Sequence, residues 1–260
     1  MTGTPVVGVL HVPALPGAPA NRLNFEEIRS FVARDAEAYA DGGADALILE
    51  NFGDVPFFPG RVPAGTVAFL TALACDIRAH FPLPLGINVL RNDGESALSI
   101  AAASGAAFIR VNVYTGARVA DQGILQGHAH EIQRLKRALA SNAMIFADVA
   151  VKHSAPLGER PLEDEVEDTI QRALADAVIV TGAATGKPVD LDALRTARAA
   201  ARGTPVFAGS GVTAETVAEI LTACDGVIAA SALKRDGHIA NPVDVERVRR
   251  FVANARAAQS

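Results

Sequence analysis

The sequence predicts an α/β fold, a single (β/α)8 TIM barrel spanning residues 1–260. Three observations support this fold class. The length of 260 residues is typical of such barrels. Half of the residues are apolar, only 5% are aromatic and none is Trp, so the core must consist mainly of small aliphatic side chains. Eight short apolar runs alternate with amphipathic stretches, which predicts a parallel sheet with right-handed crossovers.

The eight expected strands are short and rich in Val, Ile, Leu and Ala. In chain order they are Val6–Leu10, Ala46–Leu49, Leu85–Val89, Phe108–Val113, Met144–Val151, Ala177–Val180, Pro205–Ala208 and Val227–Ala229. Apolar residues at helical spacing predict intervening helices, which include Phe25–Asp41, Thr66–His80, Leu162–Leu174 and Ala214–Thr222. No linker or shift of composition divides the chain, so we expect one domain.

A repeat at the entries to alternate strands favours a closed barrel over an open sheet. The segments that lead into strands two, four, six and eight read GADALI, GAAFI, LADAVI and ACDGVI. Small residues allow a tight turn from helix to strand. Asp45, Asp176 and Asp225 are expected to hydrogen-bond the backbone of their own turns.

Charge and cysteine content limit the functions that this chain can have. The net charge of −5 argues against nucleic acid as a partner. Cys75 and Cys224 are too few for a disulfide framework, which favours the reducing cytoplasm. No basic leader precedes the first strand, and the longest weakly polar run, Ala97–Ile109, is too short to cross a bilayer. We therefore expect a cytoplasmic protein without a transmembrane segment, and peripheral membrane contact stays open.

Two turns that contain glycine and serine predict a phosphate site. Pro205–Thr213 (PVFAGSGVT) is read as a strand, a turn and the start of a helix near Thr213, and Gly226–Lys234 (GVIAASALK) repeats the pattern. Glycine lets the backbone approach a ligand closely, and helix starts offer N–H groups to an anion. The predicted phosphate-binding residues are Gly209, Ser210, Gly211, Ala230 and Ser231.

A dinucleotide site is the alternative for the first of these turns. Gly209–Ala214 matches the pattern G-x-G-x-x-A, which belongs after the first strand of an open sheet, with an acidic residue at the end of the next strand. Here the turn follows the seventh strand, and the next strand ends in Ala230 and Ser231. This context favours a barrel phosphate site.

Polar side chains gather at the carboxyl ends of the other strands, where barrel enzymes hold their active sites. Strand periodicity places Arg110 and Asn112 on one face, and Asp148 and Lys152 likewise share a face. We expect Glu50 and Asp148 to act as acid and base, while the amides and Arg110 orient substrate and stabilise negative charge. The full set of candidate catalytic residues is His11, Glu50, Asn88, Arg110, Asn112, Asp148 and Lys152.

Several of these residues also have a structural interpretation. Arg110 and Asp148 together satisfy the requirements of a buried ion pair. Lys152 fits an anion partner or, as the less favoured alternative, a Schiff-base lysine. His11 and His153 fit loop histidines with ordinary hydrogen bonds.

The presence of a metal ion is open from the sequence. Glu50, Asp54 and Asp148 form a carboxylate set that suits Mg²⁺ with water ligands. No spacing of His and Cys demands Zn²⁺. His128 and His130 are two residues apart, which would place them on different helix faces and disfavours a shared metal.

Two loops are long for a compact barrel, which favours a functional role. Phe52–Gly65 contains three Pro and three Phe, and its Phe side chains are expected to roof a pocket or to contact another subunit of a homo-oligomer. Tyr114–Gly127 contains Gly116, Gly123 and Gly127 as candidate hinges. A plain surface excursion is the alternative for this second loop.

Segments along nearly the whole chain resemble the BtpA/SgcQ family. They are GVLHVPALPGAP (8–19), GGADALILENFGDVPF (42–57), PLGINVLRND (84–93), FIRVNVYTGARVADQG (108–123), ADVAVKHSAPL (147–157), VIVTGAATG (178–186), GSGVT (209–213) and ALKRDGHIANPVD (232–244). The resemblance implies a barrel of the ribulose-phosphate-binding type. It also implies a link of some members to photosystem I biogenesis and peripheral thylakoid association, whereas other members occur without photosynthesis. Many members have Gly where this chain has Ala230.

Two function classes follow from these observations. The first is an enzyme that binds a phosphorylated small molecule, either a sugar phosphate or a nucleotide-derived one. Isomerase, epimerase or lyase chemistry fits its acid–base set, with hydrolysis and glycosyl transfer still open. The second is a non-catalytic assembly or stability factor for a membrane complex such as photosystem I, with the Phe-rich loop as its binding surface.

Overall fold

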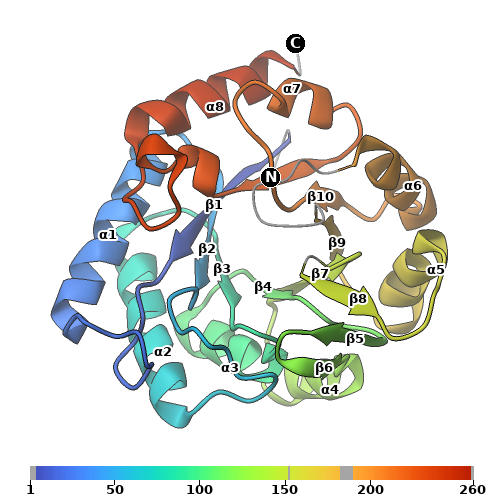
Figure 1. The fold of residues 1–260 in the computed structure, drawn as a ribbon, viewed down its shortest axis with the longest axis horizontal. Helices are drawn as coiled ribbons and strands as arrows, with labels where there is room; N and C mark the ends of the chain where they lie inside the picture. The colour runs from blue at the N-terminus through green and yellow to red at the C-terminus, as the bar shows by residue number, and fades with distance from the viewer. Residues whose placement is uncertain (1–3, 152, 182–189, 259–260) are drawn as a thin grey trace.

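The computed structural model of the chain describes residues 4–151, 153–181 and 190–258. Eight parallel strands form a closed barrel with helices around it (Figure 1). In order around the barrel they are β1 (Val6–His11), β11 (Gly226–Ala229), β10 (Val206–Ala208), β9 (Ala177–Val180), β7 (Met144–Val149), β4 (Phe108–Val111), β3 (Leu85–Asn88) and β2 (Ala46–Glu50). The predicted (β/α)8 barrel is confirmed, and each predicted strand is present.

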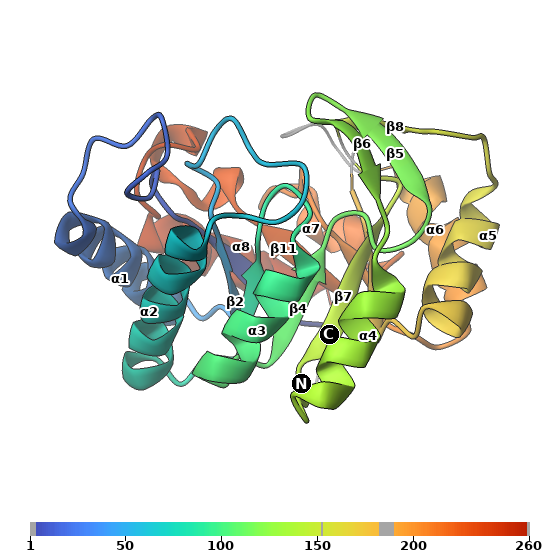
Figure 2. The same cartoon turned by 90° about the horizontal axis from the view of Figure 1, so that it is seen from below.

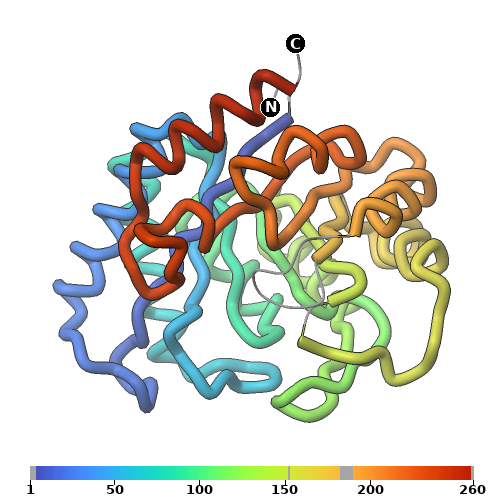
Figure 3. Tube along the Cα trace, turned by 45° about the horizontal axis from the view of Figure 1, so that its top comes forward, coloured from blue at the N-terminus to red at the C-terminus, as the bar shows by residue number. Residues whose placement is uncertain are grey.

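Helices cover the outside of the barrel. They are α1 (Phe25–Asp41), α2 (Ala64–His80), α3 (Gly94–Ser104), α4 (Ala129–Ala138), α5 (Leu162–Glu167), α6 (Leu191–Ala201), α7 (Val217–Ile220) and α8 (Val245–Ala257). Asn24 caps α1 through a reciprocal capping box with Glu27. The last helix, α8, packs beside α1 and closes the ring (Figure 3). Within the described ranges, every helix is too short or too polar to span a lipid bilayer.

Two predicted helices are shorter than expected. The chain does not enter a helix near Thr213, because residues 214–216 form a turn and α7 begins only at Val217. The Thr216 hydroxyl accepts a hydrogen bond from Thr213 N at 3.1 Å, and such local bonds compete with helix formation. The predicted helix Leu162–Leu174 is divided into α5 and a π-helical turn at Asp168–Arg172.

The segment predicted as a loop at Tyr114–Gly127 contains a β-hairpin that sequence reasoning missed. Its strands β5 (Ala117–Ala120) and β6 (Gly123–Gln126) pair antiparallel, and β5 also pairs with β8 (Ser154–Pro156). Figure 2 shows these three strands raised above the barrel, on the side to which the loops after β1 and β2 also project. The hairpin therefore lies over the carboxyl ends of the barrel strands.

Aromatic rings fill the interior of the barrel. Phe146 stacks on Phe108 with ring centroids 4.6 Å apart and contacts Phe207 at 5.1 Å. Gly86 and Gly226 leave space for these rings, since a Cβ at either position would overlap the ring of Phe108 or Phe207. The rings belong to an inner cluster, distinct from the larger apolar layer between strands and helices. The interior is thus a packed core, as expected for this fold.

The repeated aspartates at the strand entries tie neighbouring strands together. Each carboxylate accepts a hydrogen bond from a backbone N–H near the start of the preceding strand, at 2.7–2.9 Å: Asp45 from Val6, Asp176 from Ile145 and Asp225 from Val206. In place of the expected hydrogen bond within its own turn, each aspartate thus accepts a hydrogen bond from the adjacent strand. The remaining copy of the repeat has Ala107 at the corresponding position.

Candidate functional site

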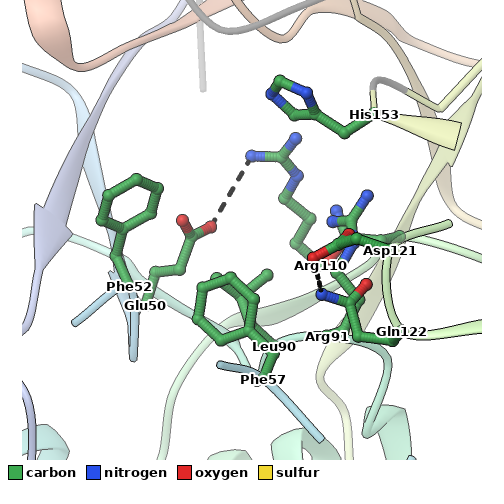
Figure 4. Close-up of a pocket in the computed structure, with 10 residues that line it drawn as sticks. Glu50, Phe52, Phe57, Leu90, Arg91, Arg110, Asp121, Gln122 and His153 are labelled. Atoms are coloured by element: carbon green, nitrogen blue, oxygen red, sulfur yellow. Dashed lines mark hydrogen bonds and ion pairs between the residues drawn. The ribbon is translucent and has the colours of Figure 1, made fainter. Parts of the chain in front are cut away.

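A cavity of about 460 Å³, here called the mouth cavity, opens at the carboxyl ends of the barrel strands. It is lined by Glu50, Phe52, Phe57, Leu90, Arg91, Arg110, Asn112, Asp121, Gln122 and His153. Figure 4 shows Glu50 and Phe52 on one side of this space and the hairpin residues Asp121 and Gln122 on the other. Strand ends and the hairpin thus enclose one common space.

Arg110 and Asp148 form a buried ion pair beneath the mouth cavity. Arg110 Nε and Nη2 donate to the two oxygens of Asp148, each at 2.9 Å, and Asn112 Nδ2 donates to Asp148 Oδ2 at 2.9 Å. Burial opposes the charge on Arg110, but the carboxylates of Asp148 and Glu50 together outweigh burial and raise the pKa of the guanidinium. The Asp148 side chain has no exposed surface. Both carboxylate oxygens of Asp148 therefore hold Arg110 and Asn112 in place, and the role of Asp148 as a base stays a prediction.

Glu50 is the acidic strand-end residue whose carboxylate reaches the mouth cavity. Its Oε2 accepts from Asn88 Nδ2 at 3.0 Å and lies 4.0 Å from Arg110 Nη1. Its Oε1 lies 3.8 Å from His11 Nε2. Parallel pairing explains this meeting, because the register places His11 opposite Glu50 and Glu50 opposite Asn88. Three side chains that are far apart in the sequence therefore surround the Glu50 carboxylate.

A small hollow of about 40 Å³, here called the glycine–serine hollow, adjoins the mouth cavity. Its lining includes all five predicted phosphate-binding residues: Gly209, Ser210, Gly211, Ala230 and Ser231. The two turns lie together because β10 and β11 are neighbours in the barrel. The hollow shares Glu50, Phe52 and Arg110 with the mouth cavity.

Backbone geometry accounts for the residues in the glycine–serine hollow. A Cβ at Gly209 would overlap the Ile179 side chain, and Gly211 has a φ of +71°, which disfavours any other residue. Ala230 has a φ of −137°, which its Cβ tolerates. Because α7 has only four residues and begins at Val217, it offers no helix N-terminus here. An anion in the hollow would depend on the turn backbone and hydroxyl groups.

Arg91 is a cavity residue that sequence reasoning missed. It lies three residues beyond the end of β3 and is only 5% exposed. Burial lowers the pKa of its guanidinium, and the carboxylates of Asp148 and Glu50 partly counter this effect. Asn51 holds the adjoining backbone, since its Oδ1 accepts from Leu90 N at 2.7 Å. An arginine within three residues of a strand end was the available sequence signal.

The tip of the β5–β6 hairpin adds two further residues that were missed. Asp121 and Gln122 connect the two strands, and Gln122 Nε2 donates to Asp121 Oδ2 at 2.5 Å. Arg118 on β5 donates to Ser154 Oγ at 2.8 Å and pairs with Glu165 at 3.4 Å. These contacts fasten the hairpin to β8 and α5 and hold its tip at the cavity. A two-residue connection between short alternating runs was the sequence signal for the hairpin.

The Phe-rich loop at 52–65 roofs one side of the mouth cavity, as predicted. Phe52 and Phe57 line the cavity, whereas Phe58 is 52% exposed. The ring centroid of Phe52 lies 4.5 Å from that of His11, which joins the loop to the end of β1. The three phenylalanines therefore divide between the cavity and the surface.

The carboxylates predicted to hold Mg²⁺ are not brought together. Asp54 accepts from Leu15 N at 2.8 Å and from Asn51 Nδ2 at 3.1 Å, away from Glu50. Burial raises the pKa of the Asp54 carboxyl, although these two hydrogen bonds oppose the rise. Both oxygens of Asp148 accept hydrogen bonds from the donors described above. These three carboxylates therefore do not fit a shared magnesium ion.

A different group of metal-ligating side chains lies outside the mouth cavity. Among the described residues, Glu95, His128 and Glu131 place one donor atom each within 4.8 Å of one another. His128 precedes α4, so the helical spacing argument for His128 and His130 does not apply, and their ring centroids are 6.4 Å apart. Arg61 already pairs with Glu95. Glu95 and Glu131 lie in the first turns of α3 and α4, where the helix dipole stabilises a carboxylate. The two carboxylates therefore do not need a metal ion.

Lys152 is the one predicted catalytic residue that the structure does not describe. The anion-partner and Schiff-base interpretations of this lysine stay expectations. The next residue, His153, was expected to be a loop histidine with ordinary hydrogen bonds, and in the structure it lines the mouth cavity.

Comparison with known proteins assigns the chain to a family. The BtpA family model matches residues 2–257. The chain belongs to the BtpA family. It is 45% identical over 251 residues to the photosystem I biogenesis protein BtpA of Synechocystis sp., covering 96% of this chain and 88% of that protein. It is also 45% identical over 252 residues to an uncharacterized protein of Thermococcus kodakarensis, covering 97% and 95%.

Solved structures similar to this BtpA-family chain share its barrel. N-(5′-phosphoribosyl)anthranilate isomerase from Pyrococcus furiosus superposes with a TM-score of 0.62 at 16% identity, covering 98% of this chain and 99% of that chain. KGPDC from Streptococcus mutans gives 0.63 at 12% identity over 100% of both chains. At this level of identity the similarity concerns the fold alone. The fold of the BtpA-family chain is the TIM barrel.

Proposed function

We propose that this BtpA-family chain is an enzyme that binds a phosphorylated small molecule across the two adjoining spaces at the barrel mouth. The continuity of the mouth cavity with the glycine–serine hollow, through Glu50, Phe52 and Arg110, carries the proposal. The phosphate group would occupy the hollow, and the remainder of the molecule would occupy the larger cavity. The name of the Pyrococcus furiosus isomerase, which includes a phosphoribosyl group, supports a phosphate ester.

Glu50 is the proposed acid–base residue, because its carboxylate lies where the two spaces join. Removal of a proton next to a carbonyl leaves negative charge on the carbonyl oxygen, which Arg110 would stabilise. Asp148 fixes the Arg110 guanidinium through two hydrogen bonds, so this charge is oriented before substrate arrives. Return of the proton to the opposite face of the same carbon gives epimerase chemistry. Its return to the former carbonyl carbon, with the carbonyl re-formed on the neighbouring carbon, gives isomerase chemistry. Loss of a leaving group from the carbon next to the deprotonated one gives lyase chemistry.

Ligand binding tests the phosphate site directly. A thermal-shift series with inorganic phosphate and phosphate esters should raise Tm, because a ligand at 100 times its Kd stabilises by about 2.7 kcal/mol. The same sugars without phosphate should give no comparable rise. Ser231→Ala should weaken binding, whereas Ser104→Ala, on the far helix α3, should leave binding unchanged. No rise in Tm with any phosphate compound would contradict the proposal.

Substitution of Glu50 tests the proposed chemistry. Glu50→Gln should lower kcat for a phosphate ester that the protein converts by about 10²–10⁴-fold, the usual contribution of a positioned acid–base group. Binding of that ester should persist, because Asn88 still has an oxygen to which it can donate. Glu131→Gln, outside the cavity, is the matched control. Full turnover by Glu50→Gln would exclude the assigned role.

A non-catalytic role in the assembly of a membrane complex is the second candidate. Val55 and Phe58 are 46% and 52% exposed on the loop at 52–65, and the relative from Synechocystis sp. is named for photosystem I biogenesis. Phe58→Ser should reduce association with membranes that contain photosystem I, whereas Phe57→Ser serves as a control on the cavity side. A homo-oligomer through the same surface is the related proposal. It predicts a lower mass for Phe58→Ser in light scattering.

A further inference from the structure

Two buried oxygen atoms in the mouth cavity indicate what the cavity binds. Asn112 Oδ1 and Gln122 Oε1 are buried and receive no hydrogen bond from the chain in the ranges that the structure describes. The whole Asn112 side chain is nearly inaccessible, with 3% of the residue surface exposed. Buried acceptors without donors are rare in folded proteins, because their desolvation is not compensated. Both residues line the same cavity, so a ligand is the natural source of the donors.

The orientation of both amides is fixed by carboxylates. Asn112 Nδ2 donates to Asp148 Oδ2 at 2.9 Å, and Gln122 Nε2 donates to Asp121 Oδ2 at 2.5 Å. An ionised carboxylate only accepts hydrogen bonds, so the nitrogen of each amide must face it. Exchange of the amide oxygen and nitrogen would place two acceptors against each other. Each oxygen is therefore held as an acceptor for another group.

The charges around these oxygens disfavour a carboxylate on the ligand. Glu50 and Asp121 line the cavity, and Asp148 lies beneath it. Arg110 is already engaged by Asp148, and Arg91 lies in the field of all three carboxylates. A ligand carboxylate next to Asn112 or Gln122 would face acceptor oxygens and nearby negative charge. Hydroxyl and amino groups instead donate to these oxygens and bring no negative charge.

We infer that the molecule in the mouth cavity carries, besides its phosphate, at least two hydroxyl or amino donors that face Asn112 Oδ1 and Gln122 Oε1. The substrate class is a polyhydroxylated phosphate ester, such as a phosphorylated aldose or amino sugar, and not a phosphorylated sugar acid. The tip of the β5–β6 hairpin is thereby a specificity-determining element. This inference rests on the phosphate site of the proposed function.

Binding of matched phosphate esters to the full chain tests the substrate class. Glucose 6-phosphate, glucosamine 6-phosphate and ribose 5-phosphate carry donors, 6-phosphogluconate adds a carboxylate, and pentyl phosphate has neither. Calorimetric titration should give Kd values for the best donor-bearing ester that are about tenfold or more below those for the last two compounds. Titration with inorganic phosphate measures the affinity of the glycine–serine hollow alone.

Gln122→Met tests the hairpin, because it keeps the side-chain length and removes the acceptor. It should weaken binding of the donor-bearing esters about five- to tenfold and leave inorganic phosphate unaffected. Gln126→Met makes the same change at an exposed position of the same hairpin and should have no effect. An unchanged affinity in Gln122→Met would overturn the specificity role of the hairpin.

The outcomes separate this inference from the function on which it rests. If inorganic phosphate binds but pentyl phosphate or 6-phosphogluconate binds as tightly as the donor-bearing esters, the substrate class is wrong and the phosphate site stands. If neither inorganic phosphate nor any ester binds, the proposed function itself fails, and the inference fails with it.

Discussion

Two buried ion pairs in this barrel differ in what surrounds them. Lys234 Nζ lies 2.7 Å from Asp35 Oδ2, and Asp35 Oδ1 accepts from Val243 N at 3.0 Å. The two side chains of this pair are 0% and 1% exposed. Arg110 and Asp148 are buried almost as deeply, at 3% and 0%. Exposure alone does not distinguish the two pairs.

Their neighbours do distinguish them. The Lys234 pair joins α1 to the segment after β11, and the Lys234 ammonium also lies 5.6 Å from the centre of the Phe31 ring. The Arg110 pair lies beneath the mouth cavity, beside Glu50 and beside the Asn112 oxygen that has no donor among the described residues. A buried charge pair thus indicates function only where a cavity and an unsatisfied polar atom adjoin it.

Lys234→Met gives the largest expected effect on stability. It leaves Asp35 buried without its cation, which should lower the free energy of unfolding by about 3–5 kcal/mol. Urea denaturation measures this loss, and inorganic phosphate binding should not change. Arg195→Met removes an exposed pair with Asp192 and should change stability by less than about 0.5 kcal/mol. A decrease of less than about 1 kcal/mol in the free energy of unfolding of Lys234→Met would show that this ion pair does not stabilise the fold.

Arg110→Lys sharpens the comparison at the other pair. Lysine keeps the positive charge and loses the two parallel hydrogen bonds to Asp148, so stability should fall by about 1–3 kcal/mol. Turnover should fall further, by about 10²-fold or more, because the oriented charge at the barrel mouth is lost. Parallel urea and kinetic measurements check both. A loss of stability without a loss of turnover would place this pair in the same structural class as Lys234 and Asp35.

The two cysteines differ in burial, and the difference should appear in the reactivity of their thiols. This is the smallest of the expected effects. Cys75 is exposed, whereas burial raises the pKa of the Cys224 thiol to about 11. At pH 8 roughly one Cys224 in a thousand is then the reactive thiolate, and this fraction rises as the pH approaches 11. Iodoacetamide at pH 8 should label one cysteine in the native protein and two after denaturation, as seen by mass spectrometry. Equal labelling rates for Cys75 and Cys224 would contradict the burial argument.

Much of the barrel could be predicted because its strands are local apolar runs. The same reasoning missed the β5–β6 hairpin, since each strand has only four residues and β5 takes its second partner from β8, which lies beyond β7 in the sequence. It left Asp148 open between a base and a buried partner of Arg110, because a strand-end carboxylate looks the same in sequence whether it faces a ligand or an arginine. Arg91 was missed because it follows its strand by three residues, outside the alternation that selected Asn88.

The sequence by itself determined the barrel, the end of the barrel that carries polar side chains and the pair of glycine–serine turns. These features depend on residue periodicity and on backbone freedom, which are local properties. Only the folded chain shows that Glu50 rather than Asp148 lines the mouth cavity, and that Asp54 instead accepts a hydrogen bond from Leu15 N. Tertiary structure also decided that Asn112 and Gln122 present their oxygens to one space. Such assignments depend on which donors meet each carboxylate, and only the folded chain brings those donors together.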